Sequence, residues 1–91
     1  MTSAMRPRYN PKPDYPPEAD RLGQRGIVLL EVQVGADGRV ITVSVKRSSG
    51  FPILDNAAVK GIQRWTFEPA RVAGLPIASK ADVPVKFGPP Q

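Results

Sequence analysis

The sequence predicts an α+β domain in which a three-stranded antiparallel sheet carries one amphipathic helix on one face. Two alternating apolar runs flank a turn within residues 26–47, helical periodicity follows at 51–65, and a third alternating run fills 79–87. The element order is therefore β-β-α-β, preceded by a short helical turn. With the first strand in the middle, every neighbouring pair is antiparallel and the crossover is right-handed, so we expect the strand order 2-1-3.

The composition bounds the size of the domain and its chemistry. With 91 residues, of which 41% are hydrophobic, the chain can form one small domain. It contains no cysteine and no histidine, which excludes disulfides and the usual zinc and haem ligand sets. The net charge of +5 comes from scattered basic residues, which favours a solvated surface over a nucleic-acid-binding face. No apolar run reaches the ~20 residues that span a bilayer.

No set of residues suits catalysis or metal binding. The eight carboxylates are spread along the chain with no close pair. Ser48 and Ser49 have no histidine that could act as a base. The turn GADGRV, residues 35–40, holds one acid, whereas a calcium loop needs several oxygen ligands at set spacing. We therefore expect no enzymatic activity and no cofactor.

Residues 1–14 form a proline-rich segment with almost no aliphatic side chains. This composition is typical of the end of an extended or disordered linker, so we place the folded domain at residues 15–91 and expect residues 1–13 to be mobile and dispensable for folding. The opening MTSAM is compatible with residues left by cloning. From Tyr15 the composition changes, and PPEADRLG predicts a short helical turn that Gly23 ends.

The stretch 26–47 predicts a β-hairpin around Asp37-Gly38. A two-residue type I′ turn at this dipeptide pairs Ala36 with Arg39. Continuing the pairing collects the apolar residues on one face, as Val34 with Ile41, Val32 with Val43 and Leu30 with Val45. A slip of one residue would break all of these pairs at once, which fixes the register.

After the breaker Ser48-Ser49-Gly50 the apolar residues change to helical spacing. One arc of a helical wheel collects Leu54, Ala57, Ala58, Gly61, Ile62 and Trp65. This arc predicts an amphipathic helix on the sheet, with Trp65 in the core and not exposed as a base-stacking platform. A mid-helix glycine costs about 1 kcal/mol against alanine, so we expect Gly61 to allow close approach of the helix to the sheet.

The final run alternates between an apolar and a polar face. The apolar face holds Ala81, Val83, Val85 and Phe87, and the polar face holds Lys80, Asp82, Pro84 and Lys86. Proline has no N–H for a neighbouring strand, so Pro84 marks this strand as an edge. If Pro84 faces outward, Asp82 and Lys86 also turn their backbone groups outward. Such an edge is either blunted by the proline or accepts a strand from a peptide partner, and the residues leave both interpretations open.

In their order, residues 15 to about 88 resemble the C-terminal domain of the TonB family. Each matching element is weak alone, but the ordered set is specific, and the proline-rich segment resembles the end of the TonB spacer. The elements are Tyr15-Pro16, Ala19, Gly23, Gly26, VQVGADGRVITVSV, SSG, Leu54-Asp55, Ala57-Ala58, Trp65-Thr66-Phe67, Pro69-Ala70, Gly74-Leu75-Pro76 and VPVKF.

The resemblance implies a periplasmic domain of a protein anchored in the inner membrane of a Gram-negative-type bacterium. TonB proteins work with ExbB and ExbD, draw on the proton-motive force and energise outer-membrane transporters for siderophores, haem or cobalamin. The transporter's TonB box, a short extended segment, pairs with the last strand of the domain, and the isolated domain would be a monomer or a strand-exchanged dimer. This places the partner site on Ser79, Lys80, Ala81, Asp82, Val83, Pro84, Val85, Lys86 and Phe87, beside Asp14, Tyr15 and Pro16.

One departure and two alternatives accompany the resemblance. Asp14 stands where the family carries an uncharged polar residue before Tyr-Pro. A TonB-like domain without a transport role would instead be a sensing or cell-wall-binding module of another envelope protein, and the sheet and helix do not separate the two. A TolA-like adaptor shares much of the architecture, but TolA-type domains generally carry a disulfide and this chain has no cysteine.

Overall fold

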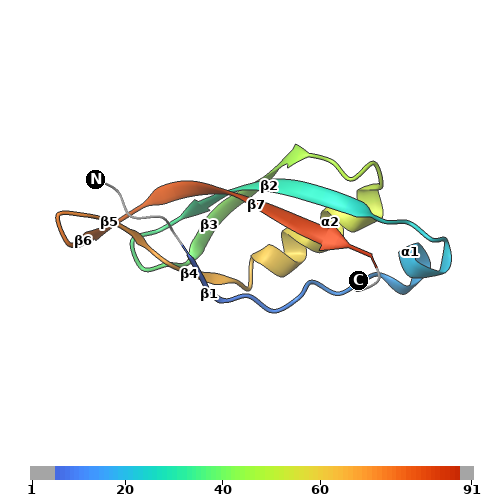
Figure 1. Cartoon of the computed structure of the whole chain (residues 1–91), viewed down its shortest axis with the longest axis horizontal. Helices are drawn as coiled ribbons and strands as arrows, with labels where there is room; N and C mark the ends of the chain where they lie inside the picture. Colours follow the sequence, from blue (N-terminus) through green and yellow to red (C-terminus); the bar gives the residue numbers. More distant parts are fainter. Residues whose placement is uncertain (1–5, 89–91) are drawn as a thin grey trace.

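The computed structural model describes residues 6–88, so the opening MTSAM and residues 89–91 lie outside the described part. The molecule is elongated, with extents of 49 × 21 × 20 Å (Figure 1). Its helices within 6–88 are α1 (Pro17–Arg21) and α2 (Pro52–Ile62). Its strands there are β1 (Arg6–Tyr9), β2 (Gly26–Val34), β3 (Val40–Arg47), β4 (Thr66–Glu68), β5 (Ala70–Val72), β6 (Leu75–Ile77) and β7 (Ser79–Phe87).

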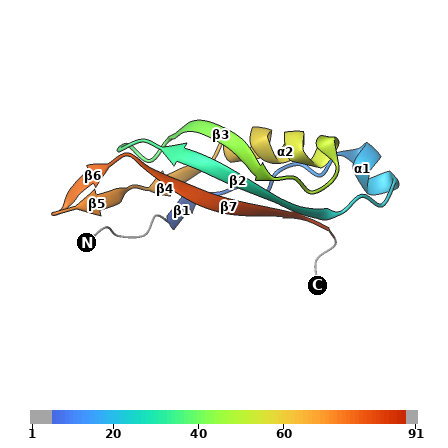
Figure 2. The ribbon, with the colours of Figure 1, turned by 90° about the horizontal axis from the view of Figure 1, so that it is seen from above.

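β2 lies in the middle of a three-stranded antiparallel sheet of order β3-β2-β7, which is the predicted 2-1-3 arrangement. α2 packs against β2 and β3 on one face of this sheet (Figure 2). The observed sheet and helix confirm the predicted α+β class. The class was predictable because the spacing of the apolar residues changes from every second residue to about every 3.6 residues at residues 48–50. The fully buried side chains of the interface are Val28, Leu30, Val32, Val34, Leu54, Ala58 and Ile62.

The turn between β2 and β3 is not the predicted type I′ turn. Gly35, and not Ala36, pairs with Arg39, since the Gly35 N–H donates to the Arg39 carbonyl at 2.9 Å. Gly38 ends this three-residue connection with a φ of +84°, the left-handed conformation that such loops require. Its carbonyl accepts the N–H of Phe67 at 2.8 Å, and a Cβ on Gly38 would lie 2.1 Å from the Phe67 oxygen. The turn is therefore fixed by a contact with β4.

A bulge beside the turn also changes the register of the hairpin. Val34 pairs with Val40 and not with Ile41, whose side chain is 61% exposed, so the predicted Val34–Ile41 pair was wrong. The added residue rotates Ile41 out of the apolar face, as bulges do. The predicted pairs Val32–Val43 and Leu30–Val45 are confirmed.

Residues 48–50 form the predicted strand-to-helix turn, and Asp55 in the first turn of α2 holds it. The Ser49 N–H and hydroxyl donate to Asp55 Oδ1 at 3.0 and 2.8 Å, and the Ser48 hydroxyl donates to Oδ2. Partial burial acts to raise the pKa of Asp55, but the hydrogen bonds from Ser48 and Ser49 outweigh it and hold the pKa below its usual value. The ionised carboxylate therefore stabilises this turn.

β5 and β6 form a small hairpin that projects from one end of the molecule (Figure 1). The sequence analysis predicted no strands at residues 70–77. Ala73 and Gly74 connect the strands with φ of +52° and +81°, both positive as in a type I′ turn. Ala73 is strained, because its Cβ disfavours the left-handed conformation.

Residues 6–16, called the leader below, run alongside the folded body. β1 pairs antiparallel with β4, and Pro13 lies against Gly61 of α2. Residues 6–13 therefore make defined contacts that the sequence did not predict, because prolines and backbone groups can pack and pair without aliphatic side chains. Their mobility stays a prediction. Gly61 was expected to contact the sheet, but it faces Pro13 instead. The domain boundary at residue 15 and the dispensability of the leader for folding stay predictions.

The Asp55 contacts predict a pH-dependent stability. Asp55→Asn should destabilise the domain at pH 7 by about 1.5 kcal/mol, the lower end for hydrogen bonds to a charged group, since the amide keeps one acceptor. Because the folded pKa is depressed, the carboxylate contributes fully above the unfolded pKa of about 3.9 and loses its contribution as the pH falls through the folded value. Urea unfolding of both proteins at pH 7 and pH 3 should show the difference shrinking at pH 3. The exposed Asp20→Asn serves as a control without this dependence.

The strained φ of Ala73 predicts a stabilising substitution. Asparagine adopts the left-handed conformation more readily than alanine, so Ala73→Asn should raise the free energy of unfolding by about 0.5 to 1 kcal/mol. Ala78→Asn, at an exposed position without a positive φ, is the matched control and should be neutral. Equal effects of the two substitutions in urea unfolding would contradict the assigned turn.

Candidate partner-binding site

β7 forms one edge of the sheet and pairs with β2 without any irregularity. Nine successive residues of β2, Gly26–Val34, face the nine residues of β7 with no register shift. β3, the opposite edge, is interrupted by two register shifts in its pairing with β2. Since bulges bend and twist a strand, β3 is a poor template for a further strand. β7 is therefore the edge at which unpaired backbone groups follow a regular alternation.

Pro84 lies opposite Leu29 near the centre of this pairing. Because proline cannot donate to β2, its backbone fits a regular ladder only when it faces the free side. Backbone groups two residues apart face the same way, so Asp82 and Lys86 also present N–H and C=O groups to the free side. The prediction that Pro84 stands on an edge strand is confirmed by the strand order.

The side chains of β7 alternate as predicted. The Asp82 carboxylate accepts a hydrogen bond from Lys46 Nζ at 2.7 Å, and this hydrogen bond and the opposite charge raise the pKa of Lys46. Both side chains are about half exposed, at 49% and 46%, so this surface ion pair adds little stability. The buried residues of the strand are Val83, Val85 and Phe87, and the exposed ones are Lys80, Asp82, Pro84 and Lys86.

The leader is held beside the C-terminal half of β7 by its polar and aromatic contacts. The Trp65 indole Nε1–H donates to the Pro11 carbonyl at 2.9 Å. The Tyr15 ring packs edge-on against Phe87, with centroids 5.6 Å apart and planes at 75°. The Tyr15 hydroxyl donates to the Gln24 carbonyl. These contacts, together with the β1–β4 pairing, give the leader a defined position.

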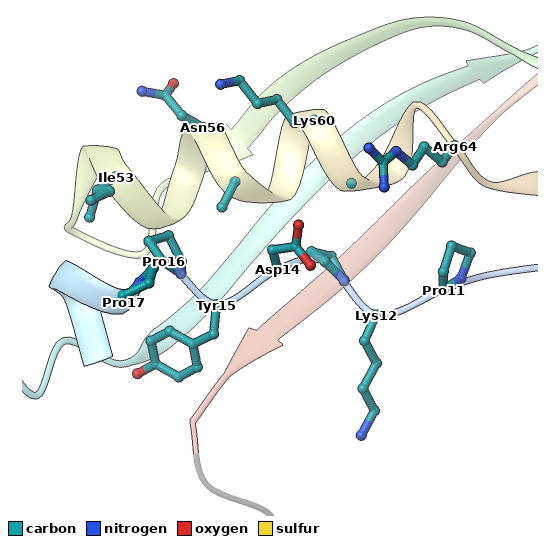
Figure 3. A pocket seen from close by; sticks show the side chains of 13 residues that line it. Pro11, Lys12, Asp14, Tyr15, Pro16, Pro17, Ile53, Asn56, Lys60 and Arg64 are labelled. Carbon is teal, nitrogen blue, oxygen red and sulfur yellow. The ribbon is translucent and has the colours of Figure 1, made fainter. Parts of the chain in front are cut away.

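Two grooves lie on either side of the leader. The first, the β7 groove, has a volume of about 490 Å³ and is lined by Asn10, Lys12, Pro13, Tyr15 and Trp65 on one side and by residues 84–88 on the other. The second, the α2 groove, has a volume of about 460 Å³ and lies between residues 11–17 and α2 (Figure 3). The leader is thus a wall common to both grooves.

The structure brings some of the predicted site residues together. Tyr15 and the C-terminal half of β7, from Pro84 to Phe87, line the β7 groove, while residues 79–83 extend the same edge beyond it. Asp14 and Pro16 line the α2 groove instead, and the Asp14 side chain points toward α2 (Figure 3). The edge and its aromatic neighbour therefore form one continuous surface.

Five residues of the β7 groove lie outside the site that the sequence predicted: Asn10, Lys12, Pro13, Trp65 and Gly88. Asn10, Lys12 and Pro13 were assigned to a mobile linker. Trp65 was assigned to the core, against which it packs, but it is partly exposed and also lines the groove. The signal that could have found the leader residues is the single indole N–H of the chain, since a tryptophan near the surface usually finds a hydrogen-bond acceptor. The acceptor is provided by the leader.

Within the part of the chain that the structure describes, this surface is accompanied by neither a metal-binding cluster nor a membrane-spanning helix. Within residues 6–88 no group of three or more His, Cys, Asp or Glu residues could hold a metal ion. In the same part of the chain no helix is both long and apolar enough to cross a membrane. The β7 groove combines backbone donors and acceptors with proline and aromatic rings, a combination that suits an extended polypeptide.

The fold defines a class of small α+β domains with a β-β-α-β core and one regular edge strand. A family model described as "Gram-negative bacterial TonB protein C-terminal" matches residues 11–89. The chain therefore belongs to the TonB C-terminal domain family, as the resemblance predicted.

Known proteins agree with this assignment. The chain is 43% identical over 79 residues to Protein tonB2 of Pseudomonas aeruginosa, covering 87% of this chain and 29% of that protein. It is 45% identical over 75 residues to Protein TonB of Xanthomonas campestris pv. campestris, covering 82% of this chain and 34% of that protein. The solution NMR structure of the Pseudomonas aeruginosa TonB C-terminal domain superposes with a TM-score of 0.78 at 28% identity, covering 98% of this chain and 90% of that one. The chain thus spans about a third of the length of these two relatives.

The Trp65–Pro11 hydrogen bond predicts how firmly the leader is held. Trp65→Phe keeps an aromatic ring but removes the donor, at a cost of about 1 kcal/mol, so the leader should open about fivefold more often. Trypsin cuts poorly before proline, which leaves Arg8-Tyr9 as the cleavable bond among Arg6-Pro7, Arg8-Tyr9 and Lys12-Pro13. Mass spectrometry should therefore show faster cleavage after Arg8 in Trp65→Phe. An unchanged cleavage rate in a folded variant would show that this hydrogen bond does not hold the leader.

Proposed function

We propose that this domain binds the TonB box of outer-membrane transporters by adding it as a further strand to the free edge of β7. The bound segment lies along Ser79–Phe87, and its part next to Pro84–Phe87 occupies the β7 groove opposite Tyr15. Strand addition draws affinity from main-chain hydrogen bonds and specificity from the pockets beside them.

The regular pairing of β7 with β2 is the observation that carries this proposal. Over nine residues this pairing turns the N–H and C=O groups of every second residue of β7 away from β2. The free edge of β7 therefore presents backbone groups at the regular spacing that a further strand needs. The opposite edge, β3, is broken by two register shifts. The proposal thus explains why one edge is regular and the other is not.

Family membership extends the proposal to the parent protein. TonB-family proteins are energy transducers of transport and not enzymes, and this domain would work in the periplasm as part of a protein anchored in the inner membrane. In that setting it would receive energy of the proton-motive force through ExbB and ExbD and drive uptake of siderophores, haem or cobalamin. Asp14 and Pro16, which line the α2 groove, would then act as neighbours of the site and not as its walls.

A pair of proline substitutions tests the proposed edge. Lys86→Pro removes an outward N–H from the β7 groove and leaves the pairing with β2 intact, so the domain should stay folded while its affinity for a synthetic TonB-box peptide falls about two- to tenfold. Val85→Pro, one residue away, removes an inward N–H that pairs with β2 and should destabilise the domain by about 1 to 3 kcal/mol. Circular dichroism and titration calorimetry measure the two effects.

Each alternative outcome has a definite meaning. A folded Val85→Pro variant beside an unfolded Lys86→Pro variant would show that the two sides of β7 are inverted. Undiminished peptide binding by a folded Lys86→Pro variant would place the site elsewhere. If the unsubstituted domain does not bind the TonB-box peptide, the transport role is contradicted, and the sensing or cell-wall-binding module becomes the better interpretation.

A further inference from the structure

Gly61 lies in the last turn of α2, where a glycine is unfavourable unless a contact requires it. A Cβ on this residue would lie 2.6 and 2.7 Å from Cβ and Cγ of Pro13, and 3.0 Å from its Cα. The absence of a side chain at Gly61 therefore makes room for Pro13 of the leader.

Pro13 could not make room for a side chain at Gly61 by itself. Its ring has no freely rotating torsion, and the third close atom, its Cα, belongs to the backbone. Lengthening the closest contact from 2.6 Å to the 3.4 Å of ordinary van der Waals contact requires a movement of about 0.8 Å. The movement must be made by the leader backbone, or by α2, which is held by its buried residues Leu54, Ala58 and Ile62.

The leader is the wall common to the β7 groove and the α2 groove, and Pro13 lines both. A strand added to β7 needs a lateral spacing of about 4.8 Å, so a movement of about 0.8 Å in the opposite wall is large on that scale. We propose that Gly61 is a positioning residue that seats Pro13 and thereby sets the width of the β7 groove. Its effect on partner affinity rests on the strand-addition function proposed above.

The contacts on either side of Pro13 would report such a movement. Pro11 precedes it and accepts the indole N–H of Trp65, while Tyr15 follows it and packs on Phe87. A displacement of Pro13 is therefore transmitted to both neighbours. Trp65 is the single tryptophan of the chain, so its indole N–H gives one unambiguous NMR signal.

The test is a cycle of substitutions at Gly61 and Pro13. Gly61→Ala adds the obstructing Cβ, and we expect a synthetic TonB-box peptide to bind about three- to tenfold more weakly by titration calorimetry, as for the loss of one strand hydrogen bond. Pro13→Gly removes the ring atoms, so the double variant should regain most of the lost affinity. Asn56→Ala raises helix propensity at an exposed position of α2 and serves as the control, with unchanged affinity.

Hydrogen exchange of the Trp65 indole N–H tests the position of the leader without any peptide. Gly61→Ala should accelerate this exchange, and Pro13→Gly in the same chain should reverse the acceleration. If the unsubstituted domain binds no peptide, the transport function fails, yet the exchange rates still decide the role of Gly61. A Gly61→Ala variant that folds only together with Pro13→Gly supports the proposal.

Two results would overturn the proposal. One is a Gly61→Ala variant with unchanged peptide affinity and unchanged indole exchange. The other is a loss of affinity that Pro13→Gly does not restore, which would show that the added methyl group acts through the helix and not through Pro13.

Discussion

The pairing of β2 with both of its neighbours is the constraint on which the rest of this small domain depends. The four inward side chains of β2, from Val28 to Val34, are fully buried, and α2 packs on them. Burial fixes the faces of β2, and a strand whose faces are fixed imposes its register on both partners. On the β7 side the register is continuous over nine residues, whereas on the β3 side it is broken twice. Because β2 is common to both pairings, the asymmetry between the two edges comes from β3, which carries one extra residue at each register shift, Ile41 and Lys46.

The leader adds only the partly buried Tyr15 to the hydrophobic core. It is held by contacts of different kinds: a short strand pairing with β4, an indole hydrogen bond to Pro11, the fit of Pro13 against Gly61, and the ring contact of Tyr15. The single hydrogen bond and the short strand pairing are each weak compared with the burial of a large side chain. The leader side of the β7 groove is therefore held less firmly than the β7 side, which belongs to the sheet.

This division explains what the sequence could and could not predict. The alternation of β2 and β7, the presence of α2 and the edge position of Pro84 are local patterns, and these were predicted correctly. The predicted arc of α2 holds for Leu54, Ala58 and Ile62 but not for Gly61, which faces the leader. The turn at Gly38 was wrong because its carbonyl accepts an N–H from Phe67, a residue far along the chain. The leader was misjudged for the same reason, since its hydrogen-bond donor, Trp65, lies 54 residues from Pro11. The leader side of the β7 groove thus depends on contacts between residues far apart in the sequence, which no local pattern predicts.

The two bulges of β3 have a further consequence for the behaviour of the domain at high concentration. A molecule with two regular edges can join copies without end, as fibre-forming sheets do. Within residues 6–88, the three-stranded sheet of each copy offers one regular edge, so two copies that pair along β7 have used the regular edges of both sheets. Such an association is closed by two-fold symmetry and leaves no regular edge of this sheet on which a filament could grow.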